Sequence, residues 1–117
     1  MDMTREEVKA YFVENESEGW LRLVDLLYDK LPLEIEITEV FQKWGHFEVR
    51  YKGENKSFEK YLYVLERVSK RMCERCGKLA VETIAGSLVE TLCKEHFEQA
   101  IVGKKANEYY PEVYPDL

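Results

Sequence analysis

Three cysteines and one histidine limit what the C-terminal third of this chain can fold into. They occur as Cys73-x2-Cys76 and Cys93-x2-His96, with sixteen residues between the two pairs. Each pair is close enough in sequence to bind one ion, and the intervening length suits a short hairpin that returns the second pair to the first. Thiolates combined with an imidazole favour tetrahedral zinc over magnesium or calcium. The sequence therefore predicts one structural Zn²⁺ per chain, with four protein ligands and no position left for a reactive water.

The residues around the four predicted ligands agree with this interpretation. Gly77 directly follows Cys76 and allows a sharp turn whose backbone N–H groups point at sulfur. Two short strands are predicted over 79–85 and 88–92, separated by a tight turn at Gly86-Ser87. Cys93 begins a helical pattern, and the positive end of a helix dipole favours a thiolate. Chance placement of buried cysteines and a surface histidine is the alternative, but all the cysteines of the chain fall in the pattern.

The order of a C-x2-C turn, a hairpin and a ligand-bearing helix resembles the treble-clef zinc finger. The resemblance rests on CERCGK and TLCKEH and covers about residues 72–103. A wider resemblance, over residues 19–96, is to small uncharacterised proteins of phages and bacterial genomes, and it rests on GWLRLVDLLYDKL, VFQKWGHFEVRY and the metal motif. This second resemblance implies a mobile-element context and brings no activity with it.

The N-terminal part predicts helices around a β-hairpin. Helices are expected over 4–15, where Thr4 opens a capping box, and over 17–30, before Pro32. Alternating residues over 33–52 predict an antiparallel hairpin with a bulge near its turn, and a helix capped by Ser57 then leads to Cys73. Trp20 and Trp44 are expected in the core.

The predicted fold class is α+β. It comprises an N-terminal helical hairpin, an antiparallel β-hairpin, a long helix and a treble-clef-like zinc module. The predicted divisions are an α+β body (1–72), a zinc-binding module packed on it (73–105) and an extended Tyr/Pro-rich tail (106–117).

Composition narrows the class of protein. The chain is 45% hydrophobic and 13% aromatic, which is too apolar for a disordered protein. It contains no apolar run near the roughly 18 residues of a membrane span, and its N-terminus shows no secretory signal. We therefore expect a globular protein of the cytoplasm, of a cell or of an infected host, with no membrane partner.

Two surfaces are candidates for binding. Although the net charge is −6, residues 67–105 carry eight basic and five acidic residues. The candidate basic face consists of Arg67, Lys70, Arg71, Lys78, Lys104 and Lys105. Such residues suit phosphate, but neighbouring acids such as Glu74 favour a simply solvated surface. In the tail, Tyr110 and Tyr114 suit a peptide that binds a protein, or one that folds back on its own domain.

No catalytic set is recognisable in the sequence. His46 has no Ser, Cys or carboxylate pair of known spacing nearby, and nucleases of the His-Asn-His type need more histidines than this chain has. The predicted function is a non-enzymatic, zinc-stabilised binding protein, a phage-type factor whose partner is a host protein. The alternative is a nucleic-acid-binding regulator that uses the basic face of residues 67–105.

Overall fold

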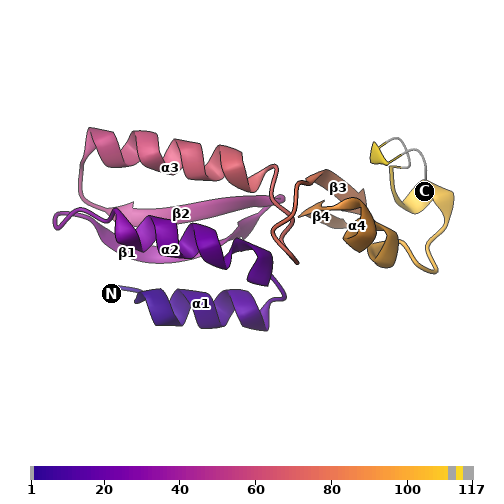
Figure 1. Ribbon diagram of the computed structural model, residues 1–117, viewed down its shortest axis with the longest axis horizontal. Coiled ribbons are helices and arrows are strands. Elements are labelled where there is room, and N and C mark those ends of the chain that lie inside the picture. The colour runs from indigo at the N-terminus through magenta and orange to yellow at the C-terminus, as the bar shows by residue number, and fades with distance from the viewer. Residues whose placement is uncertain (1, 111–112, 115–117) are drawn as a thin grey trace.

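The computed structural model describes residues 2–110 and 113–114. Helices and two antiparallel two-stranded sheets alternate along the chain, so the predicted α+β class is confirmed. The N-terminal helices and the first hairpin form one end of the molecule, and the second hairpin with its helix forms the other (Figure 1). The molecule measures 48 × 25 × 21 Å. Among the described residues, no helix is both long and apolar enough to cross a membrane.

The N-terminal helices begin as the capping pattern predicts. In α1 (Arg5–Glu14), the Thr4 hydroxyl accepts from the backbone N–H of Glu7 at 3.1 Å, and the Glu7 carboxylate accepts from the N–H of Thr4 at 3.0 Å. The helix expected over 17–30 is divided into a 3-10 turn, η1 (Glu18–Trp20), and an α-helix, α2 (Leu21–Asp29). The 3-10 turn places the Trp20 side chain in the core.

The first hairpin joins β1 (Glu36–Lys43) to β2 (His46–Lys52) through the two-residue turn Trp44-Gly45. The bulge lies between Ile37 and Glu39, at the start of β1, so the prediction of a bulge near the turn is wrong. The physical reason is burial: Ile37 and Val40 are both buried, and one extra residue between them lets both face the core.

The long helix α3 (Lys56–Ser69) begins one residue before the predicted cap, Ser57. Asn55, in an extended conformation, accepts from the N–H of Phe58 at 2.9 Å, so Asn55 is the N-cap and Ser57 lies in the first turn. α3 packs against β2 and α2. It ends four residues before Cys73 and delivers the chain to the other end of the molecule.

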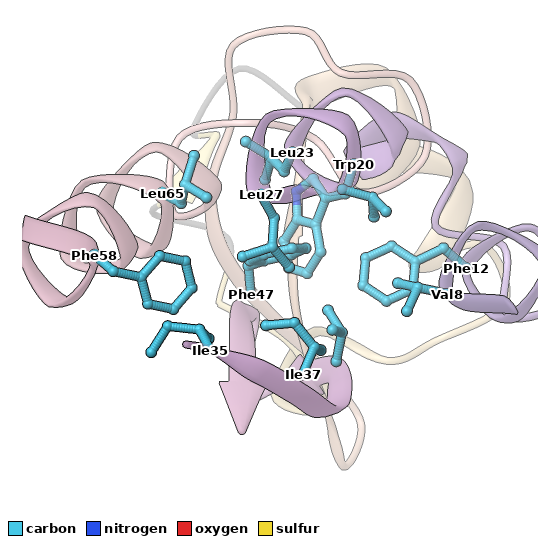
Figure 2. Close-up of a cluster of buried hydrophobic side chains, with 12 residues drawn as sticks. Val8, Phe12, Trp20, Leu23, Leu27, Ile35, Ile37, Phe47, Phe58 and Leu65 are labelled. Carbon is cyan, nitrogen blue, oxygen red and sulfur yellow. The ribbon is translucent and has the colours of Figure 1, made fainter. Parts of the chain in front are cut away.

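The core of the N-terminal part lies between the three α-helices and the first hairpin. Figure 2 shows the side chains of Phe12, Trp20, Phe47 and Phe58 pointing toward one another from different elements. The Trp20 ring meets Phe47 edge to face with 6.1 Å between centroids. Trp44 is 67% exposed, so the expectation that it belongs to the core is wrong. The two-residue turn places it at the tip of the hairpin, outside the core.

The C-terminal part has a much smaller hydrophobic cluster. It contains β3 (Val81–Ala85), β4 (Leu88–Leu92) and α4 (Lys94–Ala100), and the buried cluster consists of Cys73, Ala80, Leu92, Cys93 and Phe97. The turn at Gly86-Ser87 is the predicted two-residue turn. Such a small cluster buries too little apolar surface to hold this part of the chain in place by itself.

The described part of the tail folds back on this cluster. Residues Ala106–Glu108 form a 3-10 turn, η2, where an extended chain was expected. Tyr109 forms an isolated antiparallel β-bridge with Ala85, and the Tyr114 hydroxyl donates a hydrogen bond to the carbonyl of Leu92 at 2.8 Å. Both tyrosine rings pack on Phe97, which is completely buried. Pro111 and Pro115 of the predicted tail lie outside the described residues.

Candidate metal centre and adjoining cleft

The four predicted ligands lie together. Their sulfur and nitrogen atoms are all within 4.8 Å of one another, and the three cysteines are free thiols. The Sγ atoms of Cys76 and Cys93 are 3.8 Å apart, and His96 Nδ1 lies 3.2 Å from Cys93 Sγ and 3.6 Å from Cys73 Sγ. A tetrahedral ion with metal–sulfur bonds of about 2.3 Å requires sulfur–sulfur distances of about 3.8 Å. The four side chains can therefore hold a metal ion.

Two local structures position these atoms. After Cys73 the chain turns back on itself: the N–H of Gly77 donates to the Cys73 carbonyl, and the N–H of Cys73 donates to the Lys78 carbonyl, both at 2.8 Å. Gly77 has φ of +80°, which glycine adopts without strain. Cys93 is the N-cap of α4, so His96 comes one turn later on the same side of the helix.

The pKa values of two of the cysteine thiols are shifted in opposite directions. Burial works to raise the pKa of the Cys73 thiol, but backbone N–H groups of Cys93, Cys76 and Arg75 outweigh it and lower the pKa below its ordinary value. Partial desolvation of the sulfur, together with the nearby sulfur atoms of Cys73 and Cys93, raises the pKa of Cys76 to about 11. Thiols held this close resist ionising together, and a divalent cation between them would offset that repulsion. The donor set therefore fits a thiophilic divalent ion.

Glu74, between the first two ligands, is only 2% exposed. Its Oε2 accepts from the backbone N–H of Thr91 at 2.6 Å and from the Gln42 amide at 3.3 Å, and its backbone carbonyl accepts from the N–H of Gly19 at 2.8 Å. Burial raises the pKa of Glu74 to about 7. The expectation that Glu74 is a solvated surface charge is wrong. Its position inside the C-x2-C turn, where the backbone faces the hairpin, was the available signal.

Further hydrogen bonds join the two ends of the molecule. Trp20 Nε1 donates to the Met72 carbonyl at 2.7 Å, and Gln42 Nε2 donates to the Val89 carbonyl at 2.8 Å. The Thr91 hydroxyl donates to the Gly45 carbonyl. Arg75 donates to the Glu16 carbonyl and to the Glu90 carboxylate, both at 2.7 Å. The metal-binding part is thus held in a defined position against the N-terminal part.

Replacing Glu74 with leucine is expected to destabilise the protein by about 2 kcal/mol, because the buried N–H of Thr91 loses its side-chain acceptor. The free energy of unfolding, from urea titration followed by tryptophan fluorescence, measures this. Glu98→Leu, at an exposed position of α4, is the control and is expected to change stability little. Equal stability of the two variants would show that the Glu74 carboxylate is not a structural acceptor.

A cleft adjoins the metal centre where the two ends of the molecule meet. Its volume is about 420 Å³, and its walls come from α1, the Trp44-Gly45 turn and the β3–β4 turn. Tyr11, Trp44 and Leu88 contribute large side chains that are 39%, 67% and 61% exposed, and the buried Glu74 lies among the lining residues. The sequence analysis did not identify this cleft, because its walls are distant in sequence.

The structure divides the predicted basic face among several elements. Arg67, on α3, and Arg71, two residues after the helix ends, line a groove of about 390 Å³ with Tyr63, Val64 and Val68. The Arg67 guanidinium stacks 5.8 Å from the Tyr63 ring centroid, and Lys70 lies 3.9 Å from Glu66. Lys78 follows the first metal-binding turn, whereas Lys104 and Lys105 follow α4.

The two tail tyrosines also differ in their surroundings. Tyr110 is 58% exposed, whereas Tyr114 packs on Phe97 and is hydrogen bonded to Leu92.

Comparisons of the chain with protein-family models, with curated proteins and with solved structures found no match.

Proposed function

We propose that this protein is a non-enzymatic binding protein in which one zinc ion fixes the C-terminal hairpin and so completes a surface for a protein partner. The observation that carries the proposal is that four protein ligand atoms lie within 4.8 Å of one another. The distance between the sulfur atoms of Cys76 and Cys93 is the one that a tetrahedral ion requires. Three sulfurs and one imidazole favour zinc. Four protein ligands leave no coordination position for substrate, so the metal has a structural role.

The path of the chain supports a treble-clef-like module for residues 73–105. Cys73 and Cys76 lie in a tight turn, β3 and β4 form the following hairpin, and the first turn of α4 supplies Cys93 and His96. The hairpin sits between the two ligand pairs, so the ion would bind both of its ends. A saturated site of this kind contributes directly to folding.

The cleft supports protein binding. One wall belongs to the N-terminal part and carries Tyr11 and Trp44, and the other belongs to the metal-bound hairpin and carries Leu88. Exposed aromatic and aliphatic side chains around a recess are typical of protein interfaces. The resemblance to small phage and bacterial proteins makes a host protein the expected partner, and the cytoplasm of the host the expected location.

Affinity capture tests the protein-binding function. Zinc-loaded, tagged protein is expected to retain a partner from host lysate, and Trp44→Ala is expected to lose it because the cleft loses its most exposed aromatic ring. Tyr63→Ala, which removes a 60% exposed ring from α3, is the matched control. Failure to capture any protein, together with salt-dependent binding of DNA or RNA by the pure protein, would replace this function by the alternative below.

Nucleic-acid binding is the second candidate, and the groove along α3 favours it. Tyr63 lies beside Arg67 and Arg71 there, and proteins that bind single strands combine aromatic stacking with basic side chains in this way. The net charge of −6 opposes it. The proposal of a protein partner therefore comes first.

If the groove binds nucleic acid, Arg67→Glu combined with Arg71→Glu should weaken binding of a single-stranded oligonucleotide at least about tenfold at low salt and flatten its salt dependence. Fluorescence anisotropy measures both quantities. Lys104→Glu with Lys105→Glu makes the same change of charge after α4 and should have a smaller effect. No binding by the wild type at about 50 mM salt would remove this function, since phosphate contacts are strongest there.

A further inference from the structure

Trp44 occupies a position that folding alone does not explain. It is the first residue of a two-residue hairpin turn and has φ of +55°, a conformation that non-glycine residues adopt at an energetic cost. Turns in which both residues have positive φ favour Asn, Asp or Gly at this place. The indole is also 67% exposed, so it gains little from burial. A strained, exposed aromatic residue at the mouth of a cleft indicates a binding role.

The charges that line the cleft are acidic. Glu74 and Glu90 are the charged residues among those that line it, and Glu90 is paired with Arg75 at 2.7 Å. Glu74 uses Oε2 for its hydrogen bonds to Thr91 and Gln42. The described residues donate no hydrogen bond to Oε1, and Glu74 is one of the residues that line the cleft. The cleft therefore offers one oxygen of a nearly buried carboxylate to a ligand.

We propose that the cleft binds the guanidinium of an arginine side chain supplied by a partner protein. Trp44 provides the best aromatic face for a cation, and Tyr11, on α1, provides a second ring in the same cleft. The planar guanidinium stacks on such rings and at the same time donates to a carboxylate, here Glu74 Oε1. The inference rests on the proposed function and names the chemistry of the partner.

The metal centre contributes to this site through the hairpin. Leu88 and Val89 line the cleft from β4, a strand that ends one residue before the predicted ligand Cys93. The apolar methylene groups of a bound arginine would pack against Leu88, while its guanidinium would contact Trp44 and Glu74. Because Glu74 lies between Cys73 and Cys76, its carboxylate is held in place by the same turn that supplies two ligands.

The test uses N-acetyl-arginine amide and its uncharged isostere, N-acetyl-citrulline amide, with the zinc-loaded full chain. Arginine amide is expected to shift the indole N–H resonance of Trp44 with a dissociation constant in the millimolar range. The indole N–H of Trp20 donates a hydrogen bond to the Met72 carbonyl inside the core, so its resonance should not shift and serves as the internal reference. Citrulline amide should bind at least about fivefold more weakly, because it lacks the cation.

Variants locate the site. Trp44→Ala should weaken arginine amide binding at least about fivefold by calorimetry, whereas Tyr63→Ala, which removes an exposed ring outside the cleft, should not. Equal binding of the arginine and citrulline amides, an unmoved Trp44 signal, or unchanged binding by Trp44→Ala would each overturn the assignment. Equally tight binding of N-acetyl-lysine amide would overturn the choice of a guanidinium.

The outcomes also separate this inference from the proposed function. A chain that captures a protein partner but does not bind arginine amide would overturn the cleft assignment and leave the binding function standing. A chain that binds arginine amide in the cleft but captures no protein would overturn the protein-binding function, while the ligand chemistry of the cleft would stand.

Discussion

Replacing Cys76 with serine should abolish stoichiometric zinc binding and unfold the C-terminal part of the protein. Cys76 is exposed, so the change removes a ligand without removing volume from the core. Structural zinc sites contribute roughly 10 kcal/mol of apparent binding free energy near neutral pH, which is comparable to the whole stability of a domain of this size. The cluster around Phe97 is too small to replace that contribution.

Metal analysis and hydrogen exchange measure this effect. The wild type should bind about one zinc per chain, as expected for a single four-ligand site, and exchange protection in β4 and α4 should disappear in Cys76→Ser or after a strong chelator. Cys93→Ser should behave in the same way. Ser87→Ala, in the neighbouring turn, is the control and should keep its metal. A metal-free wild type with unchanged protection in β4 would end the zinc proposal.

Replacing Gly19 with alanine should destabilise the protein by about 3 kcal/mol or more, since a rigid clash in a packed interior is among the costlier changes. An added Cβ would collide with the Cys73 carbonyl and lie 2.6 Å from the Gly77 nitrogen and 2.7 Å from the Cys76 nitrogen. These are backbone atoms of the metal-binding turn, so relief of the clash would displace the ligands. We therefore expect weaker metal affinity as well as lower stability.

Urea unfolding and competition with a zinc chelator measure the two effects. Gly103→Ala is the matched control: an added Cβ there meets nothing within 4 Å, but φ is +79°, so only a backbone cost of about 1 kcal/mol is expected. If Gly19→Ala were no more harmful than Gly103→Ala, the close packing of η1 on the metal-binding turn would not matter for stability.

Local patterns predicted much of the fold. The capping box at Thr4, the hairpins and the clustering of the four predicted ligands follow from short-range rules of periodicity and spacing, and the structure shows each of them. The errors were also local. Ser57 and Asn55 are both residues that favour the N-cap position, and only the packing of α3 decides which of them caps the helix. The phase break in β1 was visible, but its position depends on which residues the helices cover.

The amino-acid sequence by itself determined the metal-ligand set and the α+β class, because ligand chemistry and hydrophobic period act over a few residues. Only the tertiary structure decided that Glu74 is buried, that Gly19 must lack a side chain, and that Trp44 opens onto a cleft. Each of these depends on contacts between the N-terminal part and the C-terminal part, made by residues more than thirty positions apart along the chain. Zinc bound by these four side chains, as we propose, would hold the C-terminal part in shape. The position of that part against the first hairpin creates the surface that we propose binds a partner.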